Sequence, residues 1–183
     1  MPAIPYVTPP QRGVSPTVDA IRERRGGGLL NLDRMLLHSP PFAAGWNVFL
    51  GAVRNALSLR ADWRELAICF IAVLNRAEYE FQQHGPEYLA NGGREAALQA
   101  LRLGQDCLLD PALSGEDRTV LLLTLAMTRD VDVPPPVLEA ARTLVGSDQG
   151  LVELIGVIAA YNMVSRFLVA TGVSLDGEGD GDP

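Results

Sequence analysis

Apolar residues recur with helical spacing along the chain from residue 29 to about residue 170. The first such group is Leu29, Leu32, Met35 and Leu36. Repeats of three and four residues place side chains on one face of an α-helix. No segment of convincing length alternates apolar and polar residues, as a half-buried strand would. The pattern therefore predicts an all-α fold.

Prolines, glycines and capping residues divide this pattern into a compact bundle of about seven or eight helices. The expected helices cover about residues 29–37, 41–57, 62–74, 77–90, 94–103, 114–129, 134–145 and 148–170. The apolar run at 66–74 is too continuous for a surface helix. We therefore expect that helix to lie at the centre of the bundle.

The two ends of the chain have a different composition. Residues 1–28 are rich in Pro, Gly and Arg, and residues 174–183 are mostly acidic residues and Gly. Such segments bury too little apolar surface to order themselves alone. We predict a flexible arm at 1–28, one helical domain at 29–173 and a disordered acidic tail at 174–183.

Composition excludes several partners. The 183 residues are 48% apolar, enough for one ordinary core, and the net charge of −7 comes with no basic cluster that could bind nucleic acid. The apolar stretch 151–170 contains Glu153, Asn162 and Arg166, which are costly in hydrocarbon, so it is interpreted as a core helix with no membrane contact. Residues 1–10 hold no signal-peptide pattern, so we expect a cytoplasmic protein.

Glu80 and His84 are the first candidates for chemistry. They lie four residues apart, so on a helix their side chains share a face and can touch. A carboxylate beside an imidazole can orient it and stabilise its charged form, which suits a general acid or base. Arg76 lies four residues before Glu80, and a solvated ion pair between those two would give the same pattern.

Glu65 is a third candidate, with a structural alternative. Together with Asp62 it resembles a capping box at a helix start. Fifteen residues separate Glu65 from Glu80, which is about 22 Å along a straight helix. The two carboxylates can share a site only if the chain bends, and the polar pair Asn75-Arg76 is the plausible place for a bend.

His38 and three polar side chains complete the candidates. His38 ends a helix, where the helix dipole would stabilise an imidazolium; alternatively it joins Glu80 and His84 as a two-histidine, one-carboxylate metal site. The candidates for substrate binding are Tyr79, Tyr161, Asn162 and His38. A tyrosine in a core helix more often serves packing, with its hydroxyl hydrogen-bonded.

Several stretches together resemble the carboxymuconolactone decarboxylase family, which includes the alkylhydroperoxidase D-like proteins. They are His38-Ser39-Pro40, Arg64-Glu65-Leu66, Glu78-Tyr79-Glu80 with His84 and Gly92, and Val152-Glu153-Leu154 with Tyr161-Asn162. The resemblance spans about residues 29–170. It implies an all-helical subunit that self-associates as a dimer, trimer or hexamer, with sites at or near subunit contacts.

The peroxidase branch of that family uses a Cys-x-x-Cys pair. Glu65 and His84 match its Glu and His, but Ala77 and Glu80 stand at the cysteine positions. Without the attacking thiol, we expect no thiol peroxidase activity. The remaining cysteines, Cys69 and Cys107, lie 38 residues apart among apolar neighbours, and we expect buried, inert thiols.

The decarboxylase branch lacks cysteines and carries Glu-x-x-x-His at this place, so the resemblance implies that Glu80 and His84 are the acid–base pair, with Glu65 as a further catalytic residue. The expected activity is a lyase that needs no cofactor or metal and acts on a small lactone or keto acid by decarboxylation, isomerisation or ring opening. Arg64, Arg76 and Arg166 are candidates to bind a substrate carboxylate. The alternatives are a non-catalytic or ligand-binding protein, and a metal-dependent oxygenase or hydrolase that uses His38, Glu80 and His84.

Overall fold

The computed structural model describes residues 2–177, and in this range it contains nine α-helices, one 3-10 helix and no strand. The all-α prediction is confirmed. In chain order the elements are α1 (Pro16–Arg25), α2 (Asn31–Leu36), α3 (Pro40–Asn55), α4 (Ala61–Asn75), α5 (Glu78–Ala90), α6 (Glu95–Ala100), η1 (Leu101–Leu109), α7 (Gly115–Arg129), α8 (Pro135–Val145) and α9 (Asp148–Thr171).

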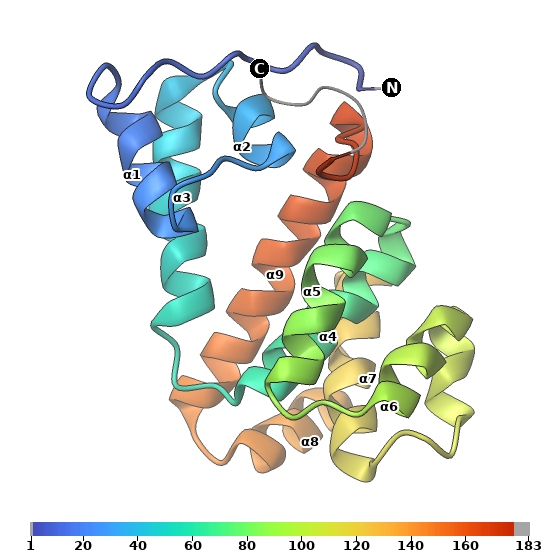
Figure 1. Cartoon of the computed structure of the whole chain (residues 1–183). Coiled ribbons are helices and arrows are strands. Elements are labelled where there is room, and N and C mark those ends of the chain that lie inside the picture. Colours follow the sequence, from blue (N-terminus) through green and yellow to red (C-terminus); the bar gives the residue numbers. More distant parts are fainter. Residues whose placement is uncertain (1, 178–183) are drawn as a thin grey trace. The chain divides into compact units, whose positions relative to one another are not determined.

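The chain divides into two compact units. Unit 1 comprises Met1–Ala56 and Leu168–Pro183, and unit 2 comprises Leu57–Phe167. In unit 2, α4 packs against α5, α7 and η1, as Figure 1 shows for the two long neighbours. Every residue from Leu66 to Ala72 is at most 1% exposed. The central helix predicted from the continuous apolar run is therefore confirmed, because this helix is covered on all sides.

A tight turn reverses the chain between α4 and α5. Arg76 caps α4 in the left-handed conformation, with φ 59°, and the Ala77 N–H donates to the Ala72 carbonyl at 2.8 Å. This pattern closes a helix end by satisfying its last carbonyls. The turn sends α5 back along α4, which places residues far apart in sequence side by side.

α9 contributes core residues to unit 2. Leu154, Val157 and Ile158 are each 0% exposed. Among the described residues, α9 alone is long and apolar enough by composition to cross a membrane, but half of its most apolar window is buried inside the protein. That signal is weak, since the core helix of a soluble protein has the same length and composition.

Residues 16–25, which we expected in a flexible arm, form helix α1 of unit 1. Local signals explain the helix: the Ser15 hydroxyl accepts from the Val18 N–H, Pro16 occupies the first turn and Gly26 caps the end with φ 79°. Val18 and Ile21 are buried, and α1 packs on α3. The apolar residues were too few to reveal the helix by periodicity, but packing against α3 buries both.

The C-terminal segment after α9 also makes defined contacts within unit 1. The Ser174 N–H donates to the Tyr6 hydroxyl at 2.8 Å, and the Asn31 N–H donates to Asp176 Oδ1 at 2.6 Å. The part of the predicted acidic tail at 174–177 is thus hydrogen-bonded to the N-terminal region, contrary to the disorder expected there. Residues 178–183 of that tail lie outside the described residues.

Candidate active site

The turn between α4 and α5 brings Glu65 and His84 into contact. Glu65 lies in the second turn of α4 and His84 in the second turn of α5. The His84 Nδ1–H donates to Glu65 Oε2 at 2.6 Å, and the two residues are only 5% and 2% exposed. The bend postulated at Asn75-Arg76 is therefore present, and it unites two of the three predicted catalytic residues.

The predicted capping box at the start of α4 is wrong. The N-cap residue is Arg60, which makes no side-chain capping bond, and α4 begins at Ala61. Asp62 therefore falls within the first turn, and its carboxylate pairs with the Arg60 guanidinium at 2.6 Å. Glu65 lies inside the helix, where its carboxylate is bonded to His84 and to the Arg64 Nε at 2.9 Å.

The surroundings of Glu65 favour its ionised form. Burial raises the pKa of this carboxyl, but the hydrogen bond and charge of His84, together with those of Arg64, outweigh burial and hold the pKa below its usual value. Glu65 is thus a buried carboxylate with a hydrogen-bonded group on each oxygen. Such a carboxylate fixes the orientation of the imidazole ring and stabilises a positive charge on it.

Glu80 has the opposite environment. It is 2% exposed, and neither of its carboxyl oxygens has a hydrogen-bond partner within residues 2–177. Burial alone raises its pKa well above the usual value, which favours the protonated form of the carboxyl. The carboxylate that holds His84 Nδ1 is Glu65, and not Glu80 as the four-residue spacing predicted.

Two buried carboxyl groups of unit 2 therefore differ in protonation. The pKa of Glu65, which is bonded to His84, is lowered, whereas the pKa of Glu80, one helical turn before His84 on α5, is raised. Environments that push the pKa values of neighbouring acids apart are the usual basis for dividing the acid and base roles in an active site. The arrangement can supply a proton from Glu80 and accept one at the imidazole of His84.

Tyr79 and Tyr161, the two tyrosines predicted to bind substrate, are both buried in unit 2. The Tyr161 ring meets the His84 ring edge-on, with centroids 5.0 Å apart and an interplanar angle of 87°. This contact packs the imidazole against an aromatic wall contributed by α9. Tyr79 precedes Glu80 on α5 and is 6% exposed. Substrate binding by either tyrosine stays a prediction.

Asn162 belongs to a polar network that the sequence did not reveal. Its Nδ2 donates to Thr128 Oγ1 at 2.9 Å, and its Oδ1 accepts from Asn75 Nδ2 at 3.1 Å. Asn75 also donates to Ser165 Oγ at 2.8 Å. The last residue of α4 is thus tied to α9, which holds the turn that unites Glu65 with His84. The signal available in the sequence was a set of polar residues inside otherwise apolar helices.

The three arginines considered for substrate binding have different surroundings. Arg64 is bonded to Glu65, Arg166 donates to Asn162 Oδ1 at 2.5 Å, and Arg76 is exposed at the α4 cap. Arg64 and Arg166 therefore already have intramolecular acceptors. The Arg64 guanidinium acts on the site through the charge that it places beside Glu65.

His38 belongs to unit 1, whereas the other candidate residues belong to unit 2. It is exposed, and its Nε2–H donates to the Pro5 carbonyl at 2.7 Å. Within the part of the chain that the structure describes, no three His, Cys, Asp or Glu side chains are grouped so that they could hold a metal ion. His38 belongs to unit 1 and the other two proposed ligands, Glu80 and His84, belong to unit 2, so metal binding by this set stays a prediction.

Both cysteines are buried and free. Burial, reinforced by the nearby carboxyls of Glu65 and Glu80, strongly raises the pKa of the Cys69 thiol. Burial, with Asp110 and Asp106 close by, raises the pKa of Cys107 to about 11. Reactive cysteines need a lowered pKa and access, so these thiols are in the inert class, as expected from the sequence.

Comparison with known proteins identifies the fold. No family model matches the chain, and no curated protein matches it. An uncharacterized peroxidase-related protein from Silicibacter sp. TM1040 superposes with a TM-score of 0.77 at 17% identity, covering 97% of this chain and 95% of that one. An alkylhydroperoxidase AhpD core structure, an uncharacterized peroxidase-related protein from Ralstonia eutropha JMP134, gives 0.75 at 18% identity, covering 96% and 95%. The chain therefore has the alkylhydroperoxidase D-like fold.

Proposed function

We propose that this chain is a cofactor-independent acid–base enzyme of the carboxymuconolactone decarboxylase type that acts on a small lactone or keto acid. One observation carries the proposal: the buried carboxyl of Glu80, which has no hydrogen-bond partner among the described residues, lies one helical turn from an imidazole that is held by a buried carboxylate, Glu65. Burying an unpartnered carboxyl destabilises a fold, so its presence beside a titratable group favours a functional role.

His84 would act as the base. Because its Nδ1–H donates to Glu65, the neutral ring carries its lone pair on Nε2. This nitrogen takes a proton from the carbon next to a carbonyl, and the electron pair of the broken C–H bond forms an enolate. Glu65 stabilises the resulting imidazolium, in the manner of the carboxylate of a catalytic triad.

Glu80 would act as the acid. Its neutral carboxyl gives a proton to a carbon of the enolate, which completes an isomerisation, and the imidazolium releases its own proton to solvent as Glu80 takes one up. In a decarboxylation the C–C bond to the leaving CO2 supplies the electron pair of the enolate, and protonation by Glu80 is the second step. The isomerisation leaves the number of protons unchanged, whereas the decarboxylation takes up one proton, which Glu80 regains from solvent. Neither route needs a cofactor, and they differ in which bond breaks first.

A non-catalytic role is the second candidate, and the depth of the cluster favours it. Glu65, Glu80 and His84 are each at most 5% exposed. A buried hydrogen bond to an ionised carboxylate also specifies one packing of two helices, as the Glu65–His84 bond does for α4 and α5. This candidate predicts a stable fold with no turnover. Self-association and a cytoplasmic location stay predictions under both candidates.

The test is a screen of lactones and β-keto acids with purified protein and three variants. Proton exchange at the carbon next to the carbonyl is followed by NMR in D2O, and CO2 release is followed separately. We expect His84→Ala and Glu80→Gln to lower turnover by about 100-fold or more, the usual contribution of a general acid or base. The matched control is Glu87→Gln, since Glu87 is an exposed carboxylate on the same helix.

Circular dichroism and thermal unfolding establish that each variant is folded. A folded His84→Ala protein that still turns over substrate would refute the role of His84. Protein that is inactive on the whole panel, with the variants folded, would favour the non-catalytic candidate.

A further inference from the structure

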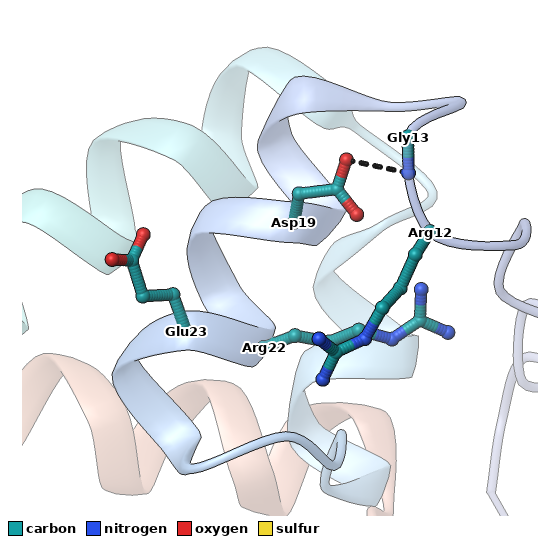
Figure 2. Close-up of a pocket in the computed structure, with 5 residues that line it drawn as sticks. All are labelled: Arg12, Gly13, Asp19, Arg22 and Glu23. Atoms are coloured by element: carbon teal, nitrogen blue, oxygen red, sulfur yellow. Dashed lines mark hydrogen bonds between the residues drawn. The ribbon is translucent and has the colours of Figure 1, made fainter.

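Unit 1 contains a cavity of about 390 Å³ that none of the candidate active-site residues lines. It is lined by Arg12, Gly13, Asp19, Arg22 and Glu23 (Figure 2). The last three belong to α1, where Asp19 lies three residues before Arg22 and four before Glu23. The first two come from the turn that precedes α1. The cavity is therefore built from one continuous segment of 12 residues, from 12 to 23.

Two hydrogen bonds fix the walls of this cavity. The Gly13 N–H donates to Asp19 Oδ2 at 2.9 Å, the bond drawn in Figure 2. The turn needs glycine there, since Gly13 has φ +83°. The Arg22 Nη1–H donates to the Pro10 carbonyl at 2.9 Å. The turn is thus tied to α1 at two points, and the Arg22 guanidinium is held in place before any ligand arrives.

The charges around the cavity are not paired with one another. Two guanidinium groups and two carboxyl groups line it, yet within residues 2–177 none of Arg12, Asp19, Arg22 and Glu23 makes an ion pair. Asp19 Oδ1 is buried and has no hydrogen-bond partner in the described part of the chain. The neighbouring arginines of α1 behave differently, because Arg24 and Arg25 both reach Asp33. Arg12 and Arg22 both line the cavity and are drawn in Figure 2.

We infer that this cavity binds a small zwitterion of amino-acid size. The guanidinium groups of Arg12 and Arg22 are suited to a carboxylate, which each can hold through two parallel N–H bonds. The carboxyls of Asp19 and Glu23 are suited to an ammonium group on the same molecule. A simple anion is a poorer match, because those two carboxyls would repel it. The volume lies near the lower end of the range for small-molecule sites, which suits a ligand of this size.

The test is a titration of the full chain with each common L-amino acid, followed by the backbone amide signals of residues 12–27 in two-dimensional NMR. L-Alanine has two matched probes: propionate, which lacks the ammonium group, and ethylamine, which lacks the carboxylate. We expect at least one amino acid to shift these signals saturably, and alanine to shift them more than propionate or ethylamine does at equal concentration. Absence of a shift with every amino acid would overturn the inference.

Variants assign the two halves of the ligand. Arg12→Gln should weaken amino-acid binding about tenfold or more, since it removes a charge-assisted contact, whereas Arg54→Gln, the same change on α3 of unit 1, should leave it unchanged. Glu23→Gln should weaken amino-acid binding without weakening that of propionate. Arg12 and Glu23 are exposed, so these substitutions spare the core. Equal binding of propionate and alanine would show a simple anion site and overturn the zwitterion assignment.

Discussion

Glu65 Oε2 accepts a hydrogen bond from His84 Nδ1 at 2.6 Å, although the two residues are 19 positions apart and lie on different helices. The contact depends on the left-handed cap at Arg76, which turns α5 back along α4. It also depends on Asn75, whose side chain is bonded to Asn162 and Ser165 of α9. The central pair of the candidate site is thus positioned by a turn and a polar network that contain no proposed catalytic group.

Glu80 should make stability fall as pH rises. Burial raises its pKa well above the ordinary 4.5, so the folded protein keeps a proton that the unfolded chain loses. Folding then takes up a proton, and the free energy of unfolding decreases from about pH 4.5 up to the raised pKa. We expect Glu80→Gln to flatten this dependence, measured by urea unfolding at several pH values. Equal slopes for variant and parent would contradict a neutral Glu80.

Glu65 should show the opposite dependence. Burial raises its pKa, but His84 and Arg64 bring it below the ordinary value, so its contribution is present above that value and is lost as pH falls through the lowered pKa. Replacing it with Gln should cost about 3 kcal/mol near neutral pH, because His84 and Arg64 lose their charged partner. The difference from the parent should shrink in acid. Glu87→Gln, at an exposed carboxylate, is the control.

Gly93→Ala should destabilise the end of the α5 segment. A Cβ at this position would lie 2.5 Å from three atoms of the Tyr88 ring, which is itself 2% exposed and cannot move freely. The expected cost is about 1–3 kcal/mol in the free energy of unfolding. Gly45→Ala is a matched control in α3, where nothing lies within 4 Å, and it should be stabilising by about 0.5–1 kcal/mol.

Leu154→Ala tests whether α9 is a core helix. Leu154 is 0% exposed, so truncation leaves a cavity and should lower the free energy of unfolding by about 2–5 kcal/mol. Val152→Ala, two residues earlier, removes methyl groups from a side chain that is 68% exposed and should change stability by less than about 0.5 kcal/mol. Similar effects of the two substitutions would show that this face of α9 is not packed as described.

Most of the helices could be predicted because their signals are local. The expected helix at 77–90 differs by one residue from α5 (Glu78–Ala90), and Gly146 caps α8 in the left-handed conformation, as its position after the apolar pattern indicates. The helix at Pro16–Arg25 was missed because Val18 and Ile21 are too few to form a pattern. Their burial depends on α3, which follows later in the chain.

The residue types of the candidate site were visible in the sequence, but their partners were not. Spacing four residues apart suggested that Glu80 holds His84, and a capping motif suggested a local role for Glu65. The structure differs on both points. Glu65 is the carboxylate that holds His84, and Glu80 has no hydrogen-bond partner among residues 2–177. His38 was placed with this group by residue type, although it belongs to unit 1 and bonds Pro5.

The all-α class, the central helix and the lack of a Cys-x-x-Cys pair follow from periodicity and composition alone. The direction in which the pKa of each buried carboxyl shifts depends on tertiary structure. The physical reason is that pKa values depend on burial and on hydrogen-bond partners from other helices, here His84 of α5 for Glu65 of α4. Tertiary structure also places the four charged side chains of segment 12–23 around one cavity, where they form no ion pair with one another.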